Sequence, residues 1–209
     1  MRSYGQYCAL AKALDVVGDR WTLLIVREIG LRGPSRYTDL RNGLPGIATN
    51  LLADRLQELE RAGVIAREDA PPPIATTLFS LTSRGRGLAS VVRELGRWGL
   101  PLMGSQSPND VFESHWLTLP VSLFLHDRDP EGDPVTIELQ AGDQSVFLRL
   151  GGGDIEVLHR YDGEVSVTVS GEPSRILELL SGKASISQAR RHGVRIKGPA
   201  EALTRVLPA

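Results

Sequence analysis

The spacing of the apolar residues changes once along the chain, and this change limits the folds that it can adopt. Up to about residue 103, apolar residues recur every three or four positions, as on one face of a helix. Between residues 135 and 169 they alternate with polar residues, which is typical of half-buried strands. The pattern therefore predicts an α+β protein with a mostly helical first part and a second part built on an antiparallel sheet.

A short polar stretch lies between the two patterned regions. Its sequence is Gly104-Ser105-Gln106-Ser107-Pro108-Asn109, small and polar residues with one proline, which favours a linker. We therefore predict one domain at 1–104 and a second at 105–209. Each is long enough to bury a core without disulfides or metals.

The charge is divided unequally between the two parts. Residues 1–107 hold 14 Arg or Lys and 10 Asp or Glu, a balance of +4, whereas residues 108–209 hold 10 and 15, a balance of −5. Such asymmetry is expected when one part binds a polyanion. The chain has one cysteine, Cys8, so an internal disulfide and a cysteine-cluster metal site are excluded. With no signal-like or membrane-spanning segment, we expect a cytoplasmic protein without membrane contact.

The order of elements in the first part is that of a winged helix-turn-helix. A helix with Leu10, Leu14 and Val17 on one face precedes a second helix that we expect to stop at Gly30. Ser35 is expected to cap a short helix, and a longer helix follows at 49–62. The predicted wing comprises 64–67 and 77–81, and a closing helix spans 83–103. Its predicted inner side carries Leu88, Val91, Val92, Leu95 and Trp98.

The helix at 49–62 is the predicted major-groove helix, because the second helix of such a pair reads base edges while its surroundings contact phosphates. Its apolar stripe faces inward, which leaves polar residues outward; asparagine and glutamine can pair bidentately with adenine. The candidate DNA-contacting residues are Arg36, Thr49, Asn50, Asp54, Arg55, Gln57 and Arg67. Each one taken singly is equally well explained as an ordinary solvated side chain.

Several motifs in fixed order resemble those of the HxlR-type regulators across residues 4–100. They include Gly18-Asp19-Arg20-Trp21-Thr22-Leu23-Leu24-Ile25, Leu44-Pro45-Gly46-Ile47, Asn50-Leu51-Leu52-Ala53-Asp54-Arg55-Leu56 and Leu59-Glu60-Arg61-Ala62-Gly63-Val64. The resemblance implies a bacterial transcription factor that binds double-stranded operator DNA as a homodimer, joined through the first and last helices of this region. The chain has Ala48-Thr49 where the family commonly has Ser-Pro, which leaves the start of the groove helix open.

Cys8 lies where some members of that family carry a redox-sensing cysteine. One interpretation is a thiol whose oxidation alters DNA affinity, which requires exposure and a lowered pKa. The other, which we favour, is a small apolar residue packed in the dimer helix, since free cysteine is among the most buried residue types.

The second part resembles the sterol carrier family over about 110–207. The resemblance rests on Val146-Phe147-Leu148-Arg149-Leu150, Gly171-Glu172-Pro173-Ser174-Arg175-Ile176-Leu177 and Val194-Arg195-Ile196-Lys197-Gly198-Pro199. It implies a five-stranded sheet covered by helices, with an apolar tunnel for a small lipophilic effector. Candidate lining residues are Val165, Val167, Val169, Leu177 and Leu180, although each could equally fill a dry core.

Motifs for catalysis are missing from the sequence, so we predict no enzyme, no cofactor and no metal. There is no G-x-S-x-G elbow and no paired-histidine motif, and the four histidines are scattered. Three hypotheses remain: a regulator gated by a lipophilic effector, a regulator with a structural second domain and thiol sensing at Cys8, and a lipid carrier without DNA binding.

Overall fold

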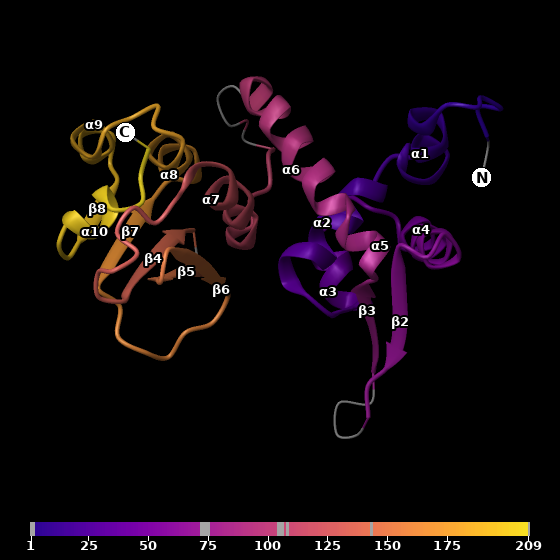
Figure 1. Ribbon diagram of the computed structural model, residues 1–209, viewed down its shortest axis with the longest axis horizontal. Coiled ribbons are helices and arrows are strands. Elements are labelled where there is room, and N and C mark those ends of the chain that lie inside the picture. The colour runs from indigo at the N-terminus through magenta and orange to yellow at the C-terminus, as the bar shows by residue number, and fades with distance from the viewer. Residues whose placement is uncertain (1–2, 72–75, 104–106, 108, 143, 209) are drawn as a thin grey trace. The chain divides into compact units, whose positions relative to one another are not determined.

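The computed structural model of the chain describes residues 3–71, 76–103, 107, 109–142 and 144–208. It divides into two compact units, residues 1–98 and 99–209, which are described separately (Figure 1). Most of the predicted linker, 104–106 and 108, and the tip of the predicted wing, 72–75, lie outside the described residues.

The N-terminal unit is helical with a small three-stranded antiparallel sheet, ordered β1-β3-β2. Its elements are α1 (Ala9–Val17), α2 (Thr22–Arg32), β1 (Ser35–Arg36), α3 (Tyr37–Asn42), α4 (Thr49–Arg61), β2 (Ile65–Asp69), β3 (Thr77–Leu81), α5 (Ser83–Arg86) and α6 (Leu88–Gly99). Strands β2 and β3 extend away from the helices as the wing (Figure 1). The order of these elements and the pairing of β2 with β3 confirm the predicted winged helix-turn-helix.

Three local predictions in this unit are wrong. Helix α2 continues through Gly30 to Arg32, because one glycine weakens a helix without ending it. Ser35 lies in β1 and its hydroxyl donates to the Gly33 carbonyl at 2.9 Å, while the Asp39 carboxylate accepts from the Arg36 N–H at the start of α3. The closing helix is divided into α5, α6 and the 3₁₀ turn η1 (Leu100–Met103).

The core of the N-terminal unit lies between α2, α3, α4 and the sheet. Its fully buried side chains include Ile25, Ile29, Leu40, Leu52 and Leu59. Helix α6 contributes only the half-buried Leu88 and Val92. The predicted inner side of the closing helix is therefore wrong for Val91, Leu95 and Trp98, which are 48%, 48% and 70% exposed. These three side chains therefore lie outside the core of the N-terminal unit.

The C-terminal unit is a five-stranded sheet with helices. Its elements are η2 (Ser114–Leu117), α7 (Thr118–Phe124), β4 (Val135–Ala141), β5 (Gln144–Gly151), β6 (Asp154–Leu158), β7 (Val167–Gly171), α8 (Pro173–Leu180), α9 (Ile186–Arg191), β8 (Arg195–Lys197) and α10 (Glu201–Thr204). The strand order is β6-β5-β4-β7-β8. The sheet is not purely antiparallel, because the central pair β4 and β7 is parallel.

Helix α7 begins at Thr118, directly after η2, and contains Pro120. Pro120 then lies in the first turn, where the missing N–H has no helical partner to lose.

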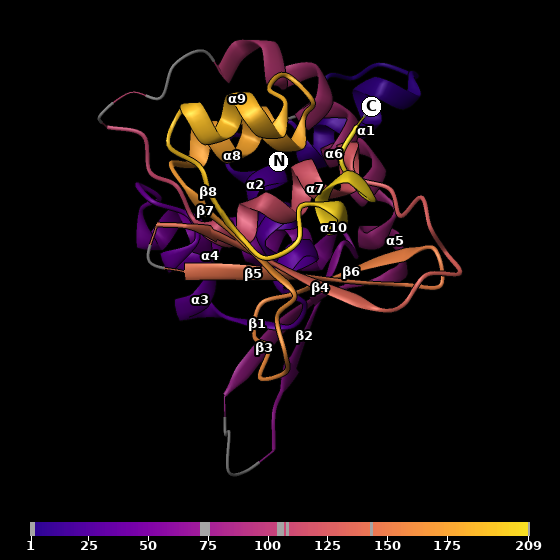
Figure 2. The same cartoon turned by 90° about the vertical axis from the view of Figure 1, so that its left-hand side faces the viewer.

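Apolar residues of α7 and α8 pack on one face of this sheet to form the second core (Figure 2). Ile137, Leu148 and Val169 come from the strands and Ile176 and Leu179 from α8, and all five are at most 2% exposed. None of the helices within the described ranges is long and apolar enough to cross a membrane.

Candidate nucleic-acid interface

Helix α4 presents one buried and one exposed face, as an amphipathic helix of this length should. Leu52, Leu56 and Leu59 are buried at 0%, 3% and 1% exposure. Four of the predicted contact residues are exposed together on the opposite face: Thr49, Asn50, Asp54 and Gln57. Ala48 occupies the N-cap position, so Thr49 is the first helical residue and its hydroxyl does not cap the helix.

The start of α4 is held by aromatic residues from two other elements. The Tyr37 hydroxyl, at the start of α3, donates to the Thr49 carbonyl at 2.7 Å. Trp21 packs against the core and its ring lies beside Gly46, before α4. Trp21 is the one non-glycine residue with positive φ (80°) among those the structure describes, a conformation unusual for a bulky side chain. The positions of Tyr37 and Trp21 in the sequence do not by themselves predict that either residue positions α4.

Arg55 lies on α4 but its guanidinium is engaged within the protein. Its Nη1 lies 2.7 Å from the Asp19 carboxylate, and it also forms an ion pair with Glu58 one turn along. The side chain is only 18% exposed. Asp19 therefore links the turn between α1 and α2 to α4.

Arg36 and Arg67 lie in the small sheet of the N-terminal unit. Both are exposed; Arg36 lies in β1 opposite Leu78, and Arg67 lies in β2 opposite Phe79. Since β3 separates β1 from β2, the two cations come from the two outer strands.

A buried carboxylate lies close to the end of α3, and the sequence did not predict its burial. Glu28 is 0% exposed and its Oε1 accepts from Arg27 at 2.7 Å, while its Oε2 accepts from Arg32 at 3.1 Å. A Cβ at Gly43 would overlap this carboxylate. The pairing i,i+4 of Glu28 and Arg32 was a possible signal, but it is also common on exposed helix surfaces.

Cys8 is exposed and stands at the N-cap of α1. The backbone N–H groups of Ala11 and Leu10 at the start of α1 lower the pKa of the thiol below its ordinary value. Lys12 is not a free cation for this thiol, because its Nζ lies 3.8 Å from Asp15.

The candidate effector residues of the C-terminal unit lie in or beside its core. Val167, Val169 and Leu180 are at most 2% exposed and belong to the apolar cluster, Leu177 packs against it, and Val165 is half-buried outside the strands. A separate open hollow is polar. It is lined by Gln140, Gly142, Ser170, Gly171, Glu172, Gly193 and Arg195, and so by none of the five candidates.

Comparison with known proteins places both units. Residues 16–107 match the HxlR-like helix-turn-helix family. The HTH-type transcriptional regulator YvaP of Bacillus subtilis is 36% identical over 87 residues, which cover 42% of this chain and 80% of that protein. The chain belongs to the HxlR family of transcriptional regulators. Residues 129–207 match the SCP-2 sterol transfer family, which confirms the second resemblance.

Other HxlR-type relatives agree with this assignment. The HTH-type transcriptional regulator YodB of B. subtilis is 30% identical over 89 residues, covering 43% of this chain and 79% of that protein. The solved structure of its reduced form is 28% identical, covers 50% of this chain and 100% of that one, and has a TM-score of 0.40. Because its relatives are regulators, this HxlR-type chain has a regulatory and not an enzymatic role.

Proposed function

We propose that this HxlR-type regulator binds operator DNA as a homodimer, with α4 in the major groove. The observation that carries the proposal is the exposed polar face of α4 above a fully buried leucine stripe. Asn50 and Gln57 have the side chains that pair bidentately with adenine, and Asp54 can accept from cytosine N4. Arg36 and Arg67 contact phosphates on either side, while Arg55 positions the helix through Asp19.

Exposed apolar faces on α1 and α6 support the dimer. On α1, Leu10 is 68% exposed; on α6 and the following turn, Trp98 and Leu102 are 70% and 71% exposed. A soluble chain rarely leaves such a row of large apolar residues in water, and a second copy would cover both faces. The dimer would present two copies of α4 to the half-sites of a two-fold symmetric operator.

Asn50→Ala and Gln57→Ala are each expected to weaken selective binding by about 1–3 kcal/mol, because each removes a bidentate base contact. Fluorescence polarisation with DNA from upstream of the protein's own gene measures this, with two chains per duplex as the expected stoichiometry. Arg67→Gln should instead weaken binding to all sequences and lower the salt slope by about 0.9 for each bound chain.

Leu24→Gln is a matched control for these variants, because Leu24 is exposed on α2 and lies outside the proposed DNA surface. Equal affinity of wild type and the Asn50→Ala, Gln57→Ala double variant for operator DNA would contradict the groove assignment. A chain with no salt-dependent affinity for any DNA would favour the carrier hypothesis.

Thiol sensing at Cys8 is a second candidate function, and two observations favour it. The thiol is exposed, and the N–H groups of Ala11 and Leu10 lower its pKa. Thiolate character and access are what make a cysteine reactive towards oxidants. Because this is the only cysteine in the chain, a disulfide would have to join two copies or a small thiol.

Cys8→Ser should abolish any loss of DNA affinity that diamide causes, while leaving affinity under reducing conditions unchanged. Polarisation before and after oxidation, with a non-reducing gel to detect a linked dimer, provides the measurement. A full diamide response in the Cys8→Ser chain would eliminate the thiol hypothesis.

A lipophilic effector stays a prediction for the C-terminal unit. Val167, Val169 and Leu180 pack into the core, so a ligand would have to displace or separate core side chains. Release of operator DNA by a lipophilic extract of the host cells would support gating. Unchanged binding would favour a structural role for this unit.

A further inference from the structure

Helix α9 and strand β8 gather cations in a unit whose sequence is acidic as a whole. No Asp or Glu occurs from Leu179 to Ala200. The same segment carries five exposed cations, which we call the α9–β8 basic patch: Lys183, Arg190, Arg191, Arg195 and Lys197.

The backbone keeps the central cations of the patch close together. Arg190 and Arg191 end α9, and the chain turns back at once, with the Val194 N–H donating to the Ala189 carbonyl at 2.9 Å. Arg195 then begins β8, the edge strand of the sheet. Arg195 and Lys197 share one side of that strand, since Ile196 between them packs against the core.

These cations have no acidic partners to neutralise them. Within residues 179–200, all of which are described, none of the five cations forms an ion pair, in contrast to Arg149 with Glu156 and Arg175 with Glu178. Two carboxylates lie nearby. Glu172 lines the same hollow as Arg195, and Glu138, one strand beyond Thr168, accepts hydrogen bonds from Thr168 and Ser145.

The composition of the patch fits a polyanion and not a membrane. A helix that binds a lipid surface places exposed Trp, Phe or Leu beside its cations. Between residues 179 and 200 no large apolar side chain is exposed, since Leu179, Leu180 and Val194 are buried and Ile186 and Ile196 are half-buried. Three guanidiniums on a rigid turn, by contrast, suit the evenly spaced phosphates of a duplex.

We propose, building on the proposed function, that the α9–β8 basic patch is a second DNA-contacting surface, which binds backbone phosphates without reading sequence. Both units belong to one chain, so DNA bound by α4 is tethered to the patch, and tethering of this kind gives effective concentrations of about millimolar. Weak phosphate contacts suffice at that concentration. They lengthen the occupied duplex beyond the groove helices without adding base contacts.

The test compares the full-length chain with the triple variant Arg190→Gln, Arg191→Gln, Arg195→Gln on long duplex DNA of arbitrary sequence. Binding is measured over a range of salt concentrations. We expect the slope of log K against log salt to become shallower by roughly 2.7 for each bound chain, about 0.9 for each of its three phosphate contacts. Circular dichroism checks that the variant, whose three substituted residues are all exposed, keeps its fold.

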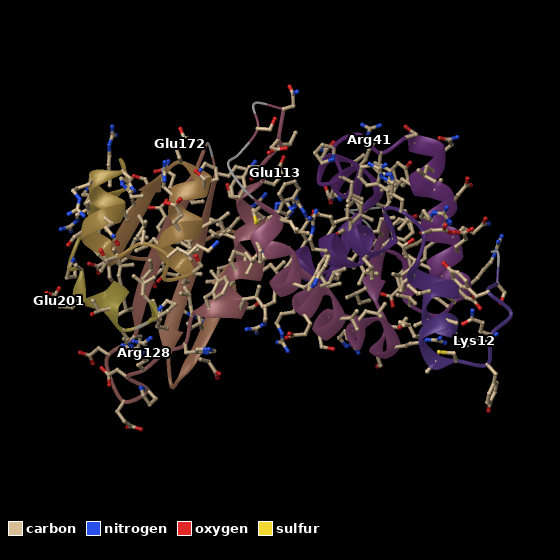
Figure 3. All side chains as sticks on the ribbon, turned by 90° about the horizontal axis from the view of Figure 1, so that it is seen from above. Lys12, Arg41, Glu113, Arg128, Glu172 and Glu201 are labelled. Carbon is tan, nitrogen blue, oxygen red and sulfur yellow. The ribbon has the colours of Figure 1, made fainter. Side chains whose placement is uncertain are left out.

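The matched control removes the same charge elsewhere in the unit, by Arg128→Gln, Arg149→Gln and Arg160→Gln. Arg149 lies on β5 and pairs with β6, towards the other edge of the sheet. Figure 3 shows Arg128 on the side of the unit opposite Glu172, which borders the patch. The control variant should keep the wild-type slope within about one unit.

Equal salt slopes in the wild type and the patch variant, or an equally large decrease of the slope in the control variant, would overturn the assignment. Binding to phosphatidylserine vesicles is measured in parallel, and a patch variant that loses only vesicle binding would overturn it as well. The proposed function is tested separately by operator selectivity. If only the patch proposal is wrong, operator selectivity still depends on Asn50 and Gln57. If only the groove assignment of α4 is wrong, the salt slope on arbitrary DNA still depends on the patch arginines.

Discussion

Arg205→Met is expected to destabilise the C-terminal unit by about 3–5 kcal/mol, because it leaves a buried carboxylate without its partner. Arg205 Nε and Nη2 donate to the two oxygens of Asp127 at 2.6 and 2.8 Å, and Nη1 donates to the Asp133 carbonyl at 2.7 Å. The side chains of Asp127 and Arg205 are 0% and 9% exposed. Together they join the segment after α7 to the end of α10.

Hydrogen exchange of β4 and β7 measures this loss directly, and helices of the N-terminal unit provide an internal reference in the same sample. The double variant Asp127→Leu, Arg205→Met should recover most of the stability, because apolar residues of similar size can replace a buried ion pair at little cost. Unchanged protection of the sheet in Arg205→Met would show that the pair is dispensable.

The same pair gives the unit a defined acid sensitivity. Hydrogen bonds from Arg205 hold the pKa of Asp127 below its ordinary value near 3.8. The pair therefore stabilises the folded unit fully above the unfolded pKa of about 3.9, and this stability is lost as pH falls through the lower folded pKa. The urea midpoint of the wild type should fall more steeply below pH 4 than that of the double variant.

Helices and strands were predictable from the sequence where a regular apolar spacing extended over many residues or where turn-forming residues marked their ends. The leucine stripe of α4 and the alternation in β4, β5 and β7 predicted those elements closely. Gly152 and Gly153, with φ of 63° and 87°, form the turn between β5 and β6, as a pair of glycines between two alternating runs favours. The parallel pairing of β4 with β7 was not predictable locally, because alternation is the same in parallel and antiparallel strands.

Errors arose where tertiary contacts decide the outcome. The apolar spacing of α6 predicted a buried face, yet its members Val91, Leu95 and Trp98 are exposed. Apolar spacing indicates that a helix face is covered, but it does not show which surface covers it. At the candidate interface, periodicity placed Asn50 and Gln57 outward. It could not show that Arg55 is engaged by Asp19, because that ion pair spans residues far apart in sequence.

Gly85→Ala is expected to destabilise the N-terminal unit by about 3 kcal/mol, the upper range for overpacking. Gly85 is buried in α5, and an added Cβ would overlap the Val64 carbonyl oxygen and lie 3.0 Å from its carbon. That carbonyl is held in place, because it accepts a hydrogen bond from the N–H of Thr82 at 3.1 Å while the Thr82 hydroxyl donates to the adjacent Gly63 carbonyl at 2.7 Å. Thermal unfolding followed by helix ellipticity measures the loss.

Gly30→Ala is the matched control, because it adds the same methyl group to a helix with room for it. A Cβ there would lie 3.5 Å from Leu81 Cδ1, an ordinary contact, and α2 is already helical through this position. Alanine should stabilise the helix by about 0.5–1 kcal/mol. The two variants are therefore expected to shift the melting temperature in opposite directions. A harmless Gly85→Ala would mean that α5 does not pack on the start of the wing.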